Sequence, residues 1–386
     1  MNKKPNVILI TVDVLRADHL GFMGYEKDVS PVIDNLAKES VVFSEAFSVG
    51  PNTPHSFPAI LTSTHPFDYQ GVKRIERPRK LISEVLKEDG FVTAAFHSNP
   101  YLSDFFGYNR GWDFFEHFSK PVGSALFPSR NRITRLKTFL TALSKKIFTK
   151  ITTAFFPQLF FRMMYWKYRL KVSKEEFEIP AEDINRTIKD FVSAQKENPF
   201  FIWVHYMDVH SPYFPNGKYE KGKVLNYSEF ISAWIAGYLE FSKSRIFKKF
   251  ITPYLKQAID FYDKGISYLD KELGNLFVFL KKEGIYQNTI ICLTADHGEE
   301  FLEHGAGFHK AKLYNELLHI PLLIKIPDKG HQLIEEKVSL ISLAPTLCQL
   351  VEAESPSSFK GKSLFDKGNE FIERAFSRRG INFIKT

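Results

Sequence analysis

The sequence predicts an α/β fold with a doubly wound, mostly parallel sheet and helices on both faces. Two apolar, β-branched runs, residues 6–12 and 289–294, have the uninterrupted character of strands that are buried on both faces. Between these runs, helical and extended patterns alternate along the chain, as in a parallel sheet with crossover helices. A chain of 386 residues can bury one large core, so we expect residues 1–386 to form a single domain.

The remaining elements follow from local signals. Ser30 and Pro31 start the first predicted helix, and Gly50 with Pro51 separates the next strand from the helix after it. The tail beyond residue 361 is expected to be irregular. The expected bounds are helix 30–39, strand 41–47, helix 56–62, helix 81–89, strand 90–96, strand 200–204, helix 258–283, strand 320–326 and helix 342–350.

Acidic and imidazole side chains follow both buried runs. Asp13 ends the first run, and the pair Asp296-His297 follows the second. The carboxyl ends of parallel strands share one edge of a sheet, so we expect these groups to converge there. Paired carboxylates at such an edge are usually kept ionised by a cation. The alternative for Asp296 is an N-capping role beside surface histidines.

Positive charge is concentrated in one segment. Residues 121–174 contain twelve Lys and Arg and no Asp or Glu, whereas the whole chain carries a net charge of +8. Within this segment, residues 135–150 have an apolar face against a basic one, and residues 155–166 are rich in aromatic side chains. We expect residues 121–178 to be an inserted basic amphipathic helical segment, and residues 216–256 to be a second insertion that forms a helical lid.

The basic insertion predicts a peripheral partner. Its pattern is typical of a helix that lies in an anionic membrane interface, and we expect residues 121–174 to make that contact. The alternatives are a cap packed on the domain and a nucleic-acid surface; the latter is not expected because no recognised binding module accompanies it.

The sequence favours a cytoplasmic location. Asp13 ends the first apolar run without a cleavage site, and no apolar stretch reaches the roughly 20 residues of a transmembrane helix. We therefore expect neither a signal peptide nor a membrane span. Cys292 and Cys348 lie in apolar runs and are expected to be buried thiols.

Several blocks of the sequence resemble the alkaline phosphatase superfamily, and more narrowly its sulfatase-type branch. They occur in the family's order from residue 6 to about 365, interrupted by the two insertions. The resemblance implies the fold predicted above and metal-dependent ester chemistry. The blocks are residues 6–24 (NVILITVDVLRADHLGFMG), 53–63 (TPHSFPAILTS), 97–116 (HSNPYLSDFFGYNRGWDFFE), 205–213 (HYMDVHSPY), 294–321, 342–346 (SLAPT) and 361–364 (GKSL).

Thr53 occupies the position at which sulfatases carry the Cys or Ser that becomes formylglycine. Threonine cannot be converted to that aldehyde, so no formylglycine is expected, and Phe57 replaces the Arg that is usual four positions later. A threonine here resembles the nucleophile of lipoteichoic acid synthases and phosphoethanolamine transferases, which favours phosphoester chemistry. From local sequence alone, Thr53 is better explained as a helix cap than as a nucleophile, and Ser56 is a weaker nucleophile candidate.

The resemblance implies a metal site. One divalent cation (Ca²⁺, Mn²⁺ or Zn²⁺) would be held by Asp13, Thr53, Asp296 and His297, and a second metal is left open. Val14 stands where many sulfatases have another acidic ligand, so the set is leaner. Weaker candidates near the expected site are Arg16, Asp18 and His304.

The resemblance also implies catalytic and substrate-binding residues. Thr53 would be the nucleophile, His210 would contact the transferred group or the leaving oxygen, and Lys310 would bind a nonbridging oxygen. For two of the substrate candidates the residues leave an alternative: a turn for Asn99 and a core position for His205. The expected substrate-binding residues are Asn99, Tyr101, His205 and His309.

The expected function is that of a metal-dependent hydrolase or transferase that acts on phosphate or sulfate esters through a threonine nucleophile. Phosphoesters are favoured, on a small-molecule, lipid or glycan substrate. One alternative is a sulfatase that works without formylglycine. Another is a relative of phosphoglycerate mutases or nucleotide pyrophosphatases, which the local blocks match less well. The last is a non-catalytic, metal-stabilised protein that docks on membranes.

Overall fold

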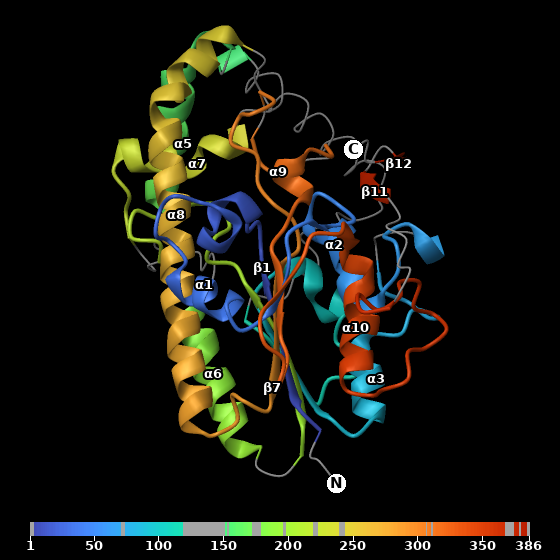
Figure 1. Cartoon of the computed structure of the whole chain (residues 1–386). Helices are drawn as coiled ribbons and strands as arrows, with labels where there is room; N and C mark the ends of the chain where they lie inside the picture. The colour runs from blue at the N-terminus through green and yellow to red at the C-terminus, as the bar shows by residue number, and fades with distance from the viewer. Residues whose placement is uncertain are drawn as a thin grey trace.

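The computed structural model has a large twisted sheet between two layers of helices (Figure 1). It describes residues 4–70, 74–118, 151–152, 154–171, 179–195, 198–218, 223–238, 244–305, 307–309, 312–366, 374–377 and 380–383. Within these residues the sheet has eight strands in the order β5-β4-β6-β1-β7-β8-β2-β9. The strands are β1 (Asn6–Val12), β2 (Val41–Phe43), β4 (Val92–His97), β5 (Phe114–His117), β6 (Phe200–Tyr206), β7 (Thr289–Ala295), β8 (Leu322–Lys325) and β9 (Gln332–Ile334).

The centre of the sheet is parallel and buried. β1 lies between β6 and β7, and every residue of these three strands is buried because helices cover both faces. Val12 at the end of β1 is paired with Ala295 of β7. This register places Asp13 and Asp296, the residues that follow the two strands, beside each other. β8 runs antiparallel to both β7 and β2.

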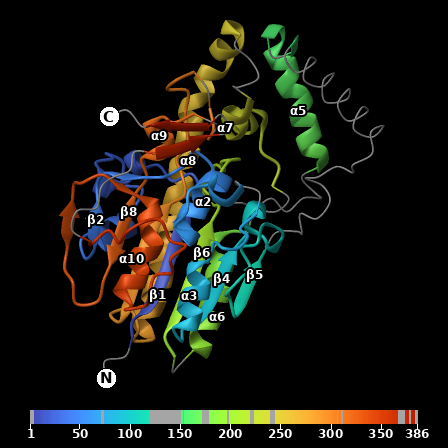
Figure 2. The same cartoon turned by 90° about the vertical axis from the view of Figure 1, so that its right-hand side faces the viewer.

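Helices cover the two faces of the sheet, as the sequence predicts (Figures 1 and 2). On one face α1 (Pro31–Ala37) and α6 (Ala181–Ala194) pack against the long helix α8 (Arg245–Lys282). On the other face α2 (Thr53–Thr62), α3 (Ile82–Glu88) and α10 (Leu343–Leu350) pack together. The doubly wound α/β prediction is therefore confirmed.

The N-terminal part of α8 projects beyond the carboxyl edge of the sheet. There it packs against α5 (Pro157–Lys171) and α7 (Tyr227–Tyr238) (Figure 2). The short helix α9 (Asn315–Leu318) lies at the same end of the molecule (Figure 1). Among the described helices, none combines the length and apolarity needed to cross a membrane.

Three predicted elements differ from the structure. The strand expected over 41–47 is divided, because a turn at Ser44 and Glu45 carries the chain from β2 to β3 (Ala46–Phe47), which pairs with β10 (Val338–Ser339). The helix expected over 56–62 begins at Thr53. The helix expected over 258–283 begins at Arg245, because Phe247 and Ile251 extend its buried face.

The tail beyond residue 361 also differs from the prediction. It includes an antiparallel pair of strands, β11 (Arg374–Ser377) and β12 (Gly380–Phe383). The amphipathic helix expected over 135–150 lies outside the described residues. The two cysteines are buried free thiols, as predicted.

A buried tyrosine of α8 supports the chain just after β1. Val14 has a φ of 56°, in the left-handed region that β-branched residues rarely adopt. The hydroxyl of Tyr262 donates to the Val14 carbonyl at 2.8 Å and accepts from the Arg16 backbone N–H at 2.9 Å. Both backbone groups are thereby paired in the interior, next to Asp13.

Replacing this hydroxyl should destabilise the protein. Tyr262→Phe leaves a buried N–H and a buried C=O unpaired, which should lower the free energy of unfolding by about 1–3 kcal/mol. Urea denaturation followed by circular dichroism measures the change. The matched control is Tyr69→Phe, whose side chain is exposed and which should change the value by less than about 0.5 kcal/mol. Equal effects of the two substitutions would contradict the role given to Tyr262.

Candidate functional site

Three chemically active side chains meet at the carboxyl edge of the sheet. Asp13 follows β1, and Asp296 and His297 follow β7; each is at most 1% exposed. The Nε2 atom of His297 lies 3.7 Å from Asp13 Oδ1 and 3.4 Å from Asp296 Oδ2. One potential ligand atom from each residue lies within 4.8 Å of the others. We call these three residues the cation cluster.

The atoms that face one another in the cation cluster are electron-rich. Asp13 Oδ1 and Asp296 Oδ2 are buried and have no hydrogen-bond partner among the described residues. His297 Nδ1 lies 2.9 Å from the Gly298 carbonyl, which can only accept, so Nδ1 carries the proton and Nε2 the lone pair. Two carboxylate oxygens and an imidazole nitrogen, without a donor between them, fit a divalent cation.

The pKa values within the cluster diverge. Burial and the nearby His309 lower the pKa of His297 to about 3, so its ring is neutral at physiological pH. Burial also raises the pKa of Asp13, but the hydrogen bond from His205 and the nearby His210 and His297 outweigh it, and the net pKa is low. Burial and the charge of Asp13 raise the pKa of Asp296 well above its usual range.

Thr53 lies beside the cation cluster. It is the first residue of α2, at the positive end of the helix dipole, and is 5% exposed. Its hydroxyl oxygen is 3.4 Å from Asp13 Oδ2 and 3.5 Å from His297 Nε2. These are long distances for hydrogen bonds, so the hydroxyl is near the cluster without being tightly held by it.

Two side chains support Asp13: His205 on β6 and Asn99, which follows β4. The amide nitrogen of Asn99 donates to Asp13 Oδ2 at 2.9 Å, and His205 Nε2 contacts the same oxygen at 3.2 Å. The other ring nitrogen of His205 lies 3.0 Å from the Thr11 hydroxyl, and the ring is fully buried. Both residues were expected to contact substrate; in the structure they contact Asp13, and for His205 the core alternative is closer to what is observed.

Two further histidines gather next to His297. The ring of His309 is centred 4.6 Å from that of His297 and 5.4 Å from that of His210. His309 Nδ1 lies 3.3 Å from Glu299 Oε1, and Glu299 Oε2 accepts from the Tyr213 hydroxyl at 3.0 Å. Glu299 and Tyr213 were not assigned from the sequence. The position of Glu299, two residues after His297, is the signal that could have identified it.

The weaker site candidates Arg16, Asp18 and His304 form ion pairs outside the cation cluster. The guanidinium of Arg16 pairs with Asp18 at 2.7 Å and with Glu303 at 2.6 Å, which engages both Arg16 and Asp18 elsewhere. His304 lies 3.2 Å from a carboxylate oxygen of Glu316. These ion pairs are the contacts in which the structure places the weaker candidates Arg16, Asp18 and His304.

The other candidates are placed as follows. The hydroxyl of Ser56 donates to the Thr53 carbonyl at 3.3 Å within α2 and is buried, so it is not directed at the cation cluster. Tyr101 is 42% exposed, and its backbone N–H donates to the Asn99 side chain. Lys310 lies outside the described residues.

Comparison with known proteins identifies relatives of the chain. A family model described as Sulfatase matches residues 5–353. Arylsulfatase K of Canis lupus familiaris is 34% identical over 125 residues, which are 32% of this chain and 23% of that protein. The aligned region thus spans less than a quarter of that relative's length.

Solved structures share the fold. The phosphonate monoester hydrolase of Agrobacterium radiobacter superposes with a TM-score of 0.64 at 17% identity, covering 96% of this chain and 79% of that one. The C-terminal periplasmic domain of EptC from Escherichia coli, in complex with zinc, gives a TM-score of 0.66 at 13% identity, covering 99% of this chain and 93% of that one.

Removing either carboxylate of the cation cluster should abolish stabilisation by a divalent cation. A cation at a hundred times its Kd stabilises the native state by about 2.7 kcal/mol, which calorimetry of chelator-treated protein detects as a higher Tm. Asp13→Asn and Asp296→Asn should lose this shift. Asp18→Asn is the control and should keep it, because Asp18 pairs with Arg16. A shift of the same size in all variants would place the cation elsewhere.

Cation affinity should rise with pH. The raised pKa of Asp296 means that the metal-free carboxyl holds a proton that a cation must displace, whereas His297 is already neutral. Titration calorimetry in buffers of different ionisation enthalpy, between about pH 5 and 8, should therefore show proton release that decreases as the pH rises. An affinity without pH dependence or proton release would contradict this assignment.

Proposed function

The chain belongs to the sulfatase family, and from that premise we propose that it is a metal-dependent phosphoesterase or phosphoryl-group transferase with Thr53 as nucleophile. The observation that carries the proposal is the position of the Thr53 hydroxyl, 3.4 Å from Asp13 and 3.5 Å from His297, at the start of α2. A nucleophile beside a cation site and a helix N-terminus is suited to attack on an anionic ester.

Asp13, Asp296 and His297 would hold the cation, with Thr53 as a further ligand. When bound, the cation would lower the pKa of the hydroxyl and orient it. We favour Zn²⁺ or Mn²⁺ over Ca²⁺, because the set contains an imidazole nitrogen, and the EptC domain with the same fold was solved with zinc.

The reaction would proceed in two steps, and residues of the chain would assist each one. In the first, Thr53 Oγ forms a bond to phosphorus while the bond to the leaving alcohol breaks. Thr53 loses its hydroxyl proton to solvent water, and the alcohol gains one, for which His210 is the proposed donor. In the second step, water or an acceptor hydroxyl attacks phosphorus and gives its proton to His210, while the bond to Thr53 Oγ breaks and that oxygen regains a proton from solvent. Lys310 is proposed to bind a nonbridging oxygen, and Glu299 to hold His309 beside the reacting group.

The nature of residue 53 supports phosphate over sulfate. Threonine cannot supply formylglycine, and Phe57, which replaces the usual Arg, is buried with its ring 5.0 Å from that of His205. A relative in fold acts on phosphonate monoesters. The proposed substrate is a lipid or glycan ester. The proposal includes a cytoplasmic location. It also includes peripheral contact with anionic membranes through residues 121–174, which contain Lys and Arg but no Asp or Glu.

A sulfuric ester hydrolase that works without formylglycine is the second candidate. It is favoured by the 34% identity to arylsulfatase K over the aligned region. In that case Thr53 would attack sulfur, and the remaining assignments would be unchanged. The two candidates differ in the ester that they turn over.

Removing the Thr53 hydroxyl should abolish turnover. With nitrophenyl phosphate, bis-nitrophenyl phosphate and nitrophenyl sulfate as substrates, we expect phosphoester hydrolysis, and a loss of at least about a thousandfold in kcat for Thr53→Ala. Thr53→Ser should retain a substantial part of the activity, because it keeps a hydroxyl at the same position. Ser56→Ala, which removes another buried hydroxyl of α2, should be near wild type.

The outcomes separate the candidates. Turnover of the sulfate alone, lost in Thr53→Ala, would support the sulfatase candidate. Phosphoester turnover that survives in Thr53→Ala but is lost in Ser56→Ala would transfer the role of nucleophile to Ser56. Turnover unaffected by both substitutions would reject a hydroxyl nucleophile from α2.

A further inference from the structure

One face of α5 is apolar and exposed. Its side chains recur at helical spacing, so they form a continuous stripe, and Phe155 and Phe156 extend this stripe before the helix begins. The exposed fractions are 67% for Phe155, 59% for Phe156, 51% for Leu159, 37% for Met163, 64% for Trp166 and 71% for Leu170. We call these six residues the aromatic ridge.

The aromatic ridge is separate from the face that holds α5 on the protein. Phe160 and Phe161 are buried on the opposite side, where the Phe161 ring stacks 5.9 Å from Phe247 of α8. A helix needs one apolar face for packing, and α5 has a second one in contact with solvent. Exposed apolar stretches of this kind usually mark an interaction surface.

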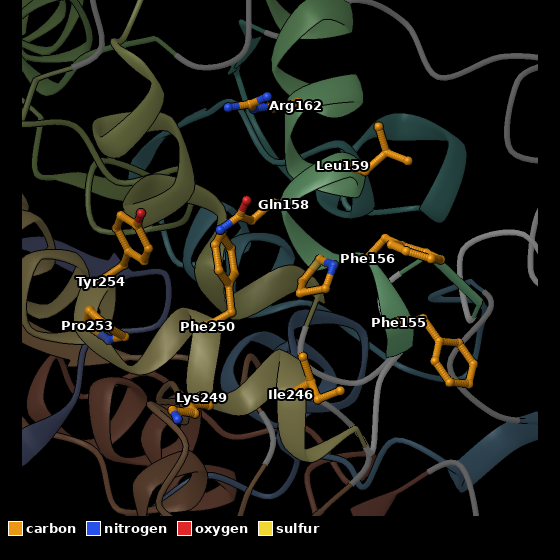
Figure 3. A pocket seen from close by; sticks show the side chains of 11 residues that line it. Phe155, Phe156, Gln158, Leu159, Arg162, Ile246, Lys249, Phe250, Pro253 and Tyr254 are labelled. Atoms are coloured by element: carbon orange, nitrogen blue, oxygen red, sulfur yellow. The ribbon is translucent and has the colours of Figure 1, made fainter.

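A groove runs between the aromatic ridge and the N-terminal part of α8. Phe155, Phe156 and Leu159 contribute one wall, and α8 contributes the other with Phe250 and Tyr254 (Figure 3). Its volume is about 780 Å³, within the range of roughly 300–1,000 Å³ that is usual for ligand sites. The eleven lining residues include two cations, Arg162 and Lys249, and no acidic residue.

The ridge and the groove carry positive charge at their borders. Arg162, Lys167 and Arg169 of α5 are exposed beside the ridge, and Lys249 of α8 lines the groove. Aromatic and aliphatic side chains flanked by lysine and arginine are characteristic of surfaces that enter the interface of a bilayer with anionic lipids. A protein partner, or a second copy of this chain, would need a surface that is both apolar and acidic in order to complement the ridge and the cations beside it.

The groove lies at the same end of the molecule as the cation cluster. α5 and the start of α8 project past the carboxyl edge of the sheet, where β1 and β7 end (Figures 1 and 2). Lys248 of α8, the neighbour of the groove residue Lys249, lies close to Gly305 in the loop after β7. The start of α8 therefore lies beside both the groove and this loop.

We propose that the aromatic ridge docks on the surface of an anionic phospholipid bilayer, with an acyl chain in the groove and lipid phosphates at Arg162 and Lys249. This inference deepens the proposed function, because a docked bilayer would present lipid head groups to the edge of the sheet that holds Thr53. It rests on the proposed function for the nature of the substrate. Membrane binding itself requires no catalytic residue.

Vesicle co-flotation of the full chain tests the proposal. We expect binding to vesicles that contain phosphatidylglycerol and phosphatidylcholine, much weaker binding to phosphatidylcholine alone, and a decrease with added salt. A variant with Phe155→Ser, Phe156→Ser and Trp166→Ser should bind at least about tenfold more weakly. Arg162→Gln with Lys249→Gln should also lose about tenfold, for the anionic vesicles only.

Matched controls separate docking from folding and from catalysis. A variant with Phe114→Ser, Val278→Ser and Leu333→Ser replaces three exposed apolar side chains elsewhere and should bind as wild type does. The ridge variant should keep wild-type turnover of a soluble nitrophenyl ester, which shows that it is folded. Thr53→Ala should still bind vesicles, so a failure of the proposed chemistry would leave the docking result unaffected.

Three outcomes would overturn the docking proposal. The first is a wild-type chain that does not bind anionic vesicles. The second is equal loss of binding in the ridge variant and the control. The third is self-association of the wild-type chain that the ridge variant abolishes while vesicle binding persists, which would make the ridge an interface between copies.

Discussion

Two buried carboxylates, Asp13 and Asp296, are brought together by the parallel register of β1 and β7, and their repulsion governs the arrangement around them. An ionised carboxylate that is buried without a partner costs roughly several kcal/mol of free energy. Asn99 and His205 reduce this cost for Asp13 by hydrogen bonding to one of its oxygens. The second oxygen faces His297 and Asp296, where the described contacts supply no donor. The pKa values of the two carboxyls are driven apart, and a divalent cation is the ligand that would relieve the repulsion.

The helix α8 connects this site to the proposed membrane surface. Its 38 residues correspond to a length of about 57 Å, so one helix reaches from the sheet to the groove beside α5. Tyr262 holds the backbone just after Asp13, and Lys248, further towards the N-terminus, lies close to Gly305. Between these two residues, Pro253 lies inside the helix, where a proline removes a backbone hydrogen bond and favours a kink. The groove and the cation cluster are therefore connected by one helix, and a surface docked through α5 would lie on the side of the carboxyl edge of the sheet.

The strand ends could be predicted because the signal is local: an uninterrupted apolar run stops at an acidic residue, and the register follows from parallel pairing. The place of Thr53 needed a family resemblance, because one hydroxyl before a helix has many explanations. The partners of Arg16 could not be read from proximity in sequence alone, because its guanidinium also pairs with Glu303, a residue remote in the chain. The contact of Glu299 with His309 was equally hidden, since it depends on how the loop after β7 folds back. The strand expected over 41–47 is divided because β2 pairs with β8 and β9, whereas β3 pairs with β10. No local sequence pattern predicts pairing with such distant segments.

The proposed charges at the site suit an anionic ester. A divalent cation would neutralise Asp13 and Asp296, and the ammonium of Lys310 would add positive charge for the nonbridging oxygens of the ester. Sulfate esters and phosphodiesters are both monoanions, so charge excludes neither; the chemistry of residue 53 must discriminate between them. An alkoxide nucleophile that forms a stable ester with phosphorus can transfer the group in a second step to water or to an alcohol. Many phospholipid head groups are phosphodiesters of this charge, and a bilayer that presents them is the partner that we propose for the aromatic ridge.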